Sequence, residues 1–132
     1  MSNSQRWERK AQLRDVVDVF GGFLGNGATL PATLYFAHSG WTLTKIGGAG
    51  TGVYRVTLRD KFVGPPIILA TVMSTGAAAP GFTVQVGNYL TPATGKWSFD
   101  LFVFAAPAGT AADLGTGARI MFTATWSDTK QP

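Results

Sequence analysis

The sequence contains no cysteine and a single histidine, His38. The missing thiols exclude a disulfide framework and any thiolate metal site. No stretch reaches the roughly 18 apolar residues that a membrane-spanning helix needs, and the basic start is not followed by the apolar run of a secretory signal. We therefore expect a soluble protein that is made in the cytoplasm.

Charged residues are also scarce. They make up 14% of the chain, against about 25% in typical domains, and Glu8 is the only glutamate. A freestanding domain of this size usually covers itself with more charge. The shortage favours a surface that is buried against copies of the chain or against another protein. The alternative is an isolated β domain with a neutral surface rich in threonine, serine and glycine.

What the chain does contain is a series of short alternating runs separated by glycine, proline, alanine and threonine. Apolar residues at every second position predict half-buried strands. Seven such runs, with no helical period between them, predict an all-β fold, an antiparallel β-sandwich or barrel of about seven strands, in a domain at residues 25–132. The runs are 33–37, 41–46, 52–59, 66–73, 82–89, 96–105 and 118–127.

The first 24 residues are predicted to form an N-terminal arm that attaches the domain to a partner. Four apolar residues have the i, i+3, i+4, i+7 spacing of one helix face, and two glycines would end such a helix. An extended arm that pairs at a sheet edge is the alternative, because valine and phenylalanine favour strands. In either form, deletion of residues 1–20 is expected to leave the β domain folded. The residues concerned are Leu13, Val16, Val17 and Phe20, followed by Gly21 and Gly22.

Alternation also predicts which side of a strand faces the core. In the strand that carries Tyr54, Val56 and Leu58, these three residues are expected to point inward. Arg55 and Arg59 are then free to face a partner or solvent.

Two runs, 66–73 and 96–105, are apolar on both sides. In the second run, Phe102 and Phe104 lie on the side opposite to the predicted core residues. A strand that is apolar on both sides is buried on both sides, which in a small sandwich indicates a subunit interface. Phe102 and Phe104 are therefore the candidate subunit-interface residues.

No residue pattern points to catalysis or to a cofactor. His38 would have to serve any Ser-His-Asp arrangement, and the aspartates after residue 18 are isolated on predicted turns and strand faces. They lack the spacing of a metal site or of paired catalytic carboxylates. The glycine string at 47–52 leads into a strand, whereas a phosphate loop leads into a helix. We expect a hairpin turn there, and we expect no enzyme, no metal and no cofactor.

The net charge of +4 would suit nucleic acid. The outward face around Arg55 and Arg59, however, mixes arginine with threonine and not with the aromatic residues that stack on bases. Nucleic acid is therefore not the expected partner.

Four stretches together resemble the strand pattern of small virion proteins of tailed bacteriophages: GTGVYRVTL (50–58), PPIILATV (65–72), FTVQV (82–86) and ARIMFTATWS (118–127). These proteins include capsid decoration (cement) proteins and head-spike proteins, and the basic, apolar start of the chain is similar to their anchoring arms. The resemblance implies a β-rich homotrimer on the exterior of the virion that binds the major capsid protein and stabilises the capsid. The capsid-binding residues would be Arg6, Trp7, Arg9, Lys10, Arg14, Val16, Val17 and Phe20.

Two other functions stay open. One is receptor or glycan binding by a knob at a fibre or spike tip, where Trp41, Trp97 or Trp126 would stack on sugar rings if exposed. Alternation places Trp97 and Trp126 on core faces, which weighs against this function. The other is an unrelated β-sandwich with a small-molecule or nucleic-acid partner.

Overall fold

The computed structural model describes residues 16–37, 40–61, 66–74, 81–90, 96–106 and 108–127. Within these ranges the chain forms nine β-strands and no α-helix, and the predicted all-β sandwich is confirmed. The strands are β1 (Val16–Leu24), β2 (Leu34–Tyr35), β3 (Trp41–Ile46), β4 (Val53–Lys61), β5 (Ile67–Ser74), β6 (Phe82–Leu90), β7 (Lys96–Ala105), β8 (Thr110–Ala111) and β9 (Ala118–Ser127).

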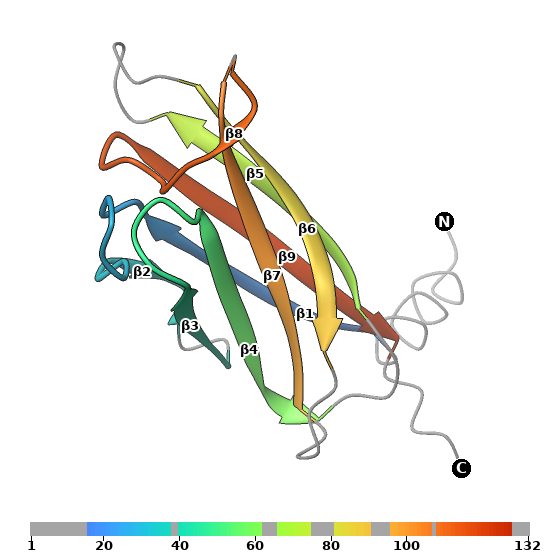
Figure 1. The fold of residues 1–132 in the computed structure, drawn as a ribbon. Coiled ribbons are helices and arrows are strands. Elements are labelled where there is room, and N and C mark those ends of the chain that lie inside the picture. The colour runs from blue at the N-terminus through green and yellow to red at the C-terminus, as the bar shows by residue number, and fades with distance from the viewer. Residues whose placement is uncertain are drawn as a thin grey trace, which may run out of the picture.

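The strands form two antiparallel sheets that pack face to face (Figure 1). The first, which we call sheet A, has the strand order β2-β1-β9-β5. The second, sheet B, has the order β3-β4-β7-β6, and the short strand β8 pairs with one end of β7. Strands β5 and β6, at the ends of the two sheets, lie close to each other along one side of the sandwich.

Alternate residues of both sheets fill the core, on the sides that the sequence predicted. Tyr54 from sheet B is fully buried, and its ring centroid lies 5.1 Å from that of Phe23 in sheet A. The Tyr54 hydroxyl accepts a hydrogen bond of 2.8 Å from the backbone N–H of Leu114, so the buried polar group is satisfied. Phe122 meets Trp41 and Phe99 edge to face, at 5.1 and 5.5 Å between centroids. Aromatic rings from distant strands thus interlock at the centre.

The last nine residues of the predicted arm belong to the sandwich. Residues 16–24 form strand β1 and not a helix, and β1 pairs with β9 along its whole length, from Val16 opposite Ser127 to Leu24 opposite Arg119. The extended form that was the alternative to a helix is the one observed. In a strand, side-chain alternation places Val19 in the core, where it is 4% exposed. Deletion through residue 20 would remove that side chain and half of the ladder. We therefore place the end of any separate arm at residue 15.

The two adjacent glycines of β1 do not end an element but allow close packing on both faces of sheet A. A Cβ atom on Gly21 would lie 2.6 Å from Cε2 of Trp41 and closer still to the ring of Phe122. A Cβ atom on Gly22, on the other side of the sheet, would collide with the thioether of Met121. Glycine is required at both positions by this steric contact.

Gly21→Ala is expected to lower the free energy of unfolding by roughly 1–3 kcal/mol, because the new methyl group overpacks the core against Phe122 and Trp41. Gly48→Ala is the matched control, since a Cβ atom there has nothing within 4 Å. Urea unfolding followed by tryptophan fluorescence measures both variants. Equal stability of the two variants would contradict this packing.

Candidate functional site

The outer face of sheet A carries large apolar side chains that the chain itself leaves uncovered. Ile67 and Leu69 are 72% and 67% exposed, Phe20 is 51% exposed and Met73 is 42% exposed. The strand register puts Phe20 and Leu69 on either side of Thr123, in one row across β1, β9 and β5. Contiguous apolar surface of this kind marks an interaction site. We call the outward side chains of β1, β9 and β5 the apolar face.

The apolar face is hollowed at its centre. A groove of about 580 Å³ lies there, with Phe20, Phe36, Leu69 and Met121 among its lining residues. Between these bulky residues the groove is lined by smaller ones, including Thr71 and Thr123. The sulfur of Met121 lies over Gly22, in the space that a side chain at that position would occupy. The surface can therefore receive apolar side chains that project from a partner.

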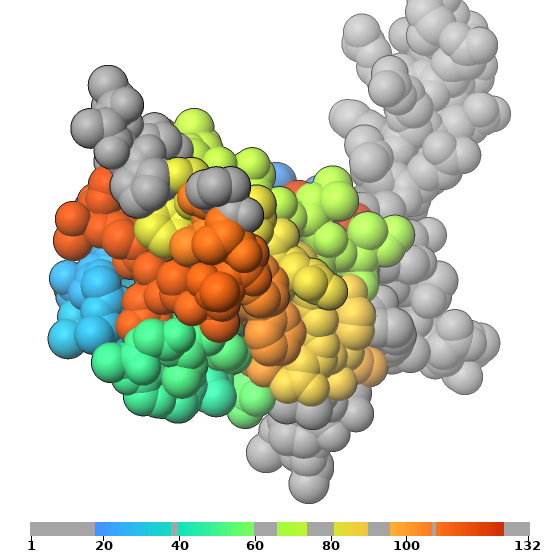
Figure 2. Space-filling model, turned by 45° about the horizontal axis from the view of Figure 1, so that its top comes forward, coloured from blue at the N-terminus to red at the C-terminus, as the bar shows by residue number. Residues whose placement is uncertain are grey.

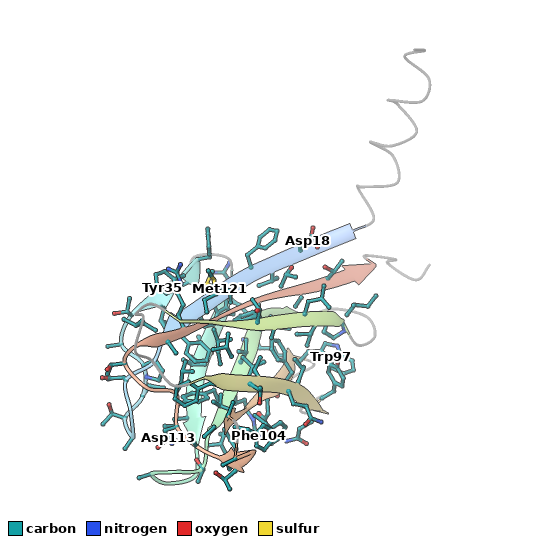
Figure 3. All side chains as sticks on the ribbon, turned by 90° about the horizontal axis from the view of Figure 1, so that it is seen from above. Asp18, Tyr35, Trp97, Phe104, Asp113 and Met121 are labelled. Atoms are coloured by element: carbon teal, nitrogen blue, oxygen red, sulfur yellow. The ribbon has the colours of Figure 1, made fainter. Side chains whose placement is uncertain are left out.

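Opposite charges stand at the two ends of the apolar face. At one end, the exposed Asp18 accepts a hydrogen bond of 2.6 Å from the hydroxyl of Thr125. At the other end, the guanidinium of Arg119 lies 5.7 Å from the centroid of the Tyr35 ring. Its Nε is buried and has no hydrogen-bond acceptor among the described residues. Figure 3 shows Asp18 and Tyr35 at opposite ends of β1, with Met121 near the Tyr35 end.

The outer face of sheet B carries the predicted interface residues, but the chain partly covers them. Phe102 lies over the backbone of Gly87, where an added Cβ atom would be 3.3 Å from its ring. Phe104 is flanked by Thr83 of β6 and by Ala111 of β8. Both phenylalanines are half-buried, less open than Ile67 or Leu69. Their role as a subunit interface stays a prediction.

Arg55, on the same outer face of sheet B, is not free as expected. Its Nε donates to Oδ1 of Asp100 at 2.8 Å, and its Nη2 donates to Oδ2 at 3.1 Å. Asn88 donates a further bond of 2.6 Å to Oδ2, and the Asp100 side chain is buried. The hydrogen bond to Asp100 raises the pKa of Arg55, against the opposing effect of burial. Alternation predicts the face of an arginine but not its cross-strand partner, because the partner depends on the register.

The glycine string 47–52 is a hairpin turn between β3 and β4, held by a carboxylate from far along the chain. The backbone N–H groups of Gly50 and Gly52 donate to Asp113 at 2.6 and 3.0 Å. Lys45 lies 2.9 Å from the same carboxylate and also donates to the carbonyl of Gly48. Figure 2 shows the orange segment that includes Asp113 against the green β3–β4 hairpin. Amides that a phosphate would need are thus used by the protein's own carboxylate.

The other residues considered from the sequence fall in different places. Among the described residues there is no group of three or more His, Asp or Glu side chains that could hold a metal ion. His38 lies outside the described residues. The part of the chain that the structure describes has no helix long and apolar enough to cross a membrane.

The predicted capsid-binding residues divide between two regions. Arg6, Trp7, Arg9, Lys10 and Arg14 lie outside the described residues. The remaining three belong to β1, where Val16 and Val17 pair with the backbone of β9 and Phe20 stands on the apolar face.

Four residues of the apolar face were not named as site residues by sequence reasoning: Ile67, Leu69, Met73 and Met121. The signal for the first three was the run 66–73, whose two apolar sides indicated a covered outer surface.

Comparison with family models, with curated proteins and with solved structures found no match for this chain in any of the three.

The Asp113 contacts link stability to pH. Burial raises the pKa of Asp113, but hydrogen bonds from Gly50, Lys45 and Gly52 outweigh burial, so the pKa lies below its ordinary value of 3.8. A group whose pKa is lower in the folded state stabilises the fold fully above the unfolded pKa. That contribution is lost as the pH falls through the folded pKa.

Asp113→Asn is expected to lower the free energy of unfolding at pH 7 by about 2 kcal/mol, because the amide loses the ion pair with Lys45 and the charged hydrogen bonds to the turn. Urea unfolding of the variant and the natural chain at pH 7 and at about pH 2 checks this. The difference between the two proteins should shrink at the lower pH. A difference of the same size at both pH values would contradict the role of the carboxylate charge.

Proposed function

We propose that this chain is a structural, non-enzymatic protein of a tailed-bacteriophage virion, a decoration protein that binds the outside of the capsid as an oligomer. The observation that carries the proposal is the apolar face, where Phe20, Ile67, Leu69 and Met73 stand exposed on a sandwich with a separate buried core. Such a face is suited to permanent contact with protein. The resemblance of the strand pattern to phage virion proteins supplies the capsid as the partner.

The mechanism follows from mass action. A protein that binds only the assembled capsid lattice stabilises that lattice by its binding free energy. Several copies joined in one oligomer gain further affinity, because the second contact becomes intramolecular. No strong single contact is needed, and no reacting group is needed either.

The register of β1 supports an arm at one end of the sandwich. Val16 is opposite Ser127, so residues 1–15 join the sandwich at the end of β9, beside Asp18. The basic residues in positions 1–15 are Arg6, Arg9, Lys10 and Arg14, and they would contact an acidic capsid surface.

The glycan-binding alternative loses part of its basis. Trp41 is 3% exposed, and its indole N–H donates to the carbonyl of Phe36 at 2.9 Å. It is therefore a core residue and does not present a ring to a sugar. Trp97 is half-buried, and the side chain of Trp126 lies outside the described part.

Deletion of residues 1–15 is expected to leave β1 and the unfolding transition unchanged but to abolish capsid binding. The measurement is co-sedimentation with purified capsids, of the phage that carries the gene, prepared without this protein. The full chain should bind these capsids and raise their temperature of thermal disruption. A chain lacking residues 128–132, which adjoin Ser127 at the same end, is the matched control and should still bind.

Failure of the full chain to bind such capsids would overturn the decoration function. Binding by the chain that lacks residues 1–15 would overturn the role of the arm alone.

A further inference from the structure

We infer that the apolar face pairs with the apolar face of a second copy, across a two-fold axis that lies between the two faces and crosses the strands. This inference deepens the proposed function, because it names the contact that would make the oligomer, and it makes that oligomer a dimer where the resemblance implied a homotrimer. It does not require the capsid to be the final partner.

The open surface of sheet A is its face and not its edge. Strand β5 ends the sheet, but β6 of sheet B lies close along it, as Figures 1 and 3 both show. Addition of a foreign strand to β5 would have to compete with this neighbour. The outward side chains of β5, by contrast, are uncovered, and Ile67 and Leu69 are the most exposed large apolar side chains among the described residues.

The area is enough for a stable pair. The exposed parts of Phe20, Phe36, Ile67, Leu69 and Met73 add up to roughly 500 Å² of apolar surface per copy. Two copies would bury roughly 1,000 Å² from these residues alone, and the polar residues around them bring the total to the size of a specific interface. Two sheets packed face to face also interdigitate their side chains across about 10 Å. Side chains of the second copy would occupy the groove.

The positions of Asp18 and Arg119 favour one of the two possible orientations of the second copy. Asp18 is opposite Thr125, and Arg119 lies six residues earlier on β9, so the two charges are about 20 Å apart along the face. An axis that crosses the strands reverses the second copy, and each Arg119 then meets the partner's Asp18 end. An axis parallel to the strands would keep like ends of the two copies together. Arg119 would then lie near the partner's Arg119, and Asp18 near the partner's Asp18. Only the first arrangement is complementary.

Arg119 has a hydrogen-bond donor for which this arrangement supplies an acceptor. Its buried Nε has no acceptor within the described chain, and a buried donor without a partner costs about 1–3 kcal/mol. The carboxylate of Asp18 uses Oδ1 for the bond from Thr125, and within the described part of the chain Oδ2 is left for another donor. The Arg119 side chain would turn outward on pairing to bring Nε within reach of this carboxylate, and guanidinium and carboxylate then fit each other in a forked geometry.

The first test is the mass of the full chain by sedimentation equilibrium over a range of concentrations. The natural chain is expected to be a dimer. Leu69→Glu should raise the dissociation constant by at least about tenfold, because it places a charge in the middle of the apolar face. Thr83→Glu is the matched control, since Thr83 is an exposed outward residue on β6 of the other sheet, and it should leave the dimer unchanged.

The second test is a charge exchange. Asp18→Arg and Arg119→Asp should each weaken the dimer by about tenfold, and the double variant should return to within about threefold of the natural chain. A monomer or a trimer of the natural chain would overturn the pairing, and so would a dimer that Leu69→Glu leaves intact. Two weakened single variants without rescue in the double variant would overturn the proposed axis.

The two proposals fail separately. A dimer that does not bind capsids leaves the pairing and removes the decoration function. Capsid binding by a chain that is monomeric in solution removes the pairing and leaves the decoration function.

Discussion

The ladder between β1 and β9 is the contact on which the rest of the structure depends. It joins the first and last described strands over nine residue pairs, from Val16 and Ser127 to Leu24 and Arg119. Its register sends Val19 and Phe23 into the core and turns Phe20 outward. A slip by one residue would exchange the two sets, because side chains alternate with a period of two. The same register sets the positions of Asp18 and Arg119.

The interior and the outer face of sheet A differ in how completely their groups are paired. The Tyr54 hydroxyl in the core is hydrogen-bonded to Leu114, and at the β3–β4 turn the carboxylate of Asp113 is held by Lys45 and two glycine amides. On the outer face, large apolar side chains meet solvent, and the Nε of Arg119 lacks an acceptor among the residues that the structure describes. A chain with few charges thus leaves one face incomplete, and the account of its function rests on that face.

Alternation predicted most of the strands, and β3, β7 and β9 have the predicted bounds. Strand β1 was ambiguous because its apolar residues fit both a helical and an extended spacing. The reason for glycine at position 21 is its close packing against Trp41, which only the structure shows. The two apolar sides of residues 66–73 indicated a covered surface. Which of the two apolar strands leaves its outer face open was not predictable, because the cover of Phe104 comes from β8, whose two residues are too few to show an alternating pattern.

The most direct measurement of the central claim is oxidative footprinting of the assembled protein. Met73 and Met121 stand on the apolar face, and Phe104 stands on the outer face of sheet B. If the protein assembles through the apolar face, oxidation of the two methionines should slow several-fold as the concentration rises through assembly, while oxidation of Phe104 stays constant. Methionine oxidation at the same rate in the dilute and the assembled protein would contradict the account.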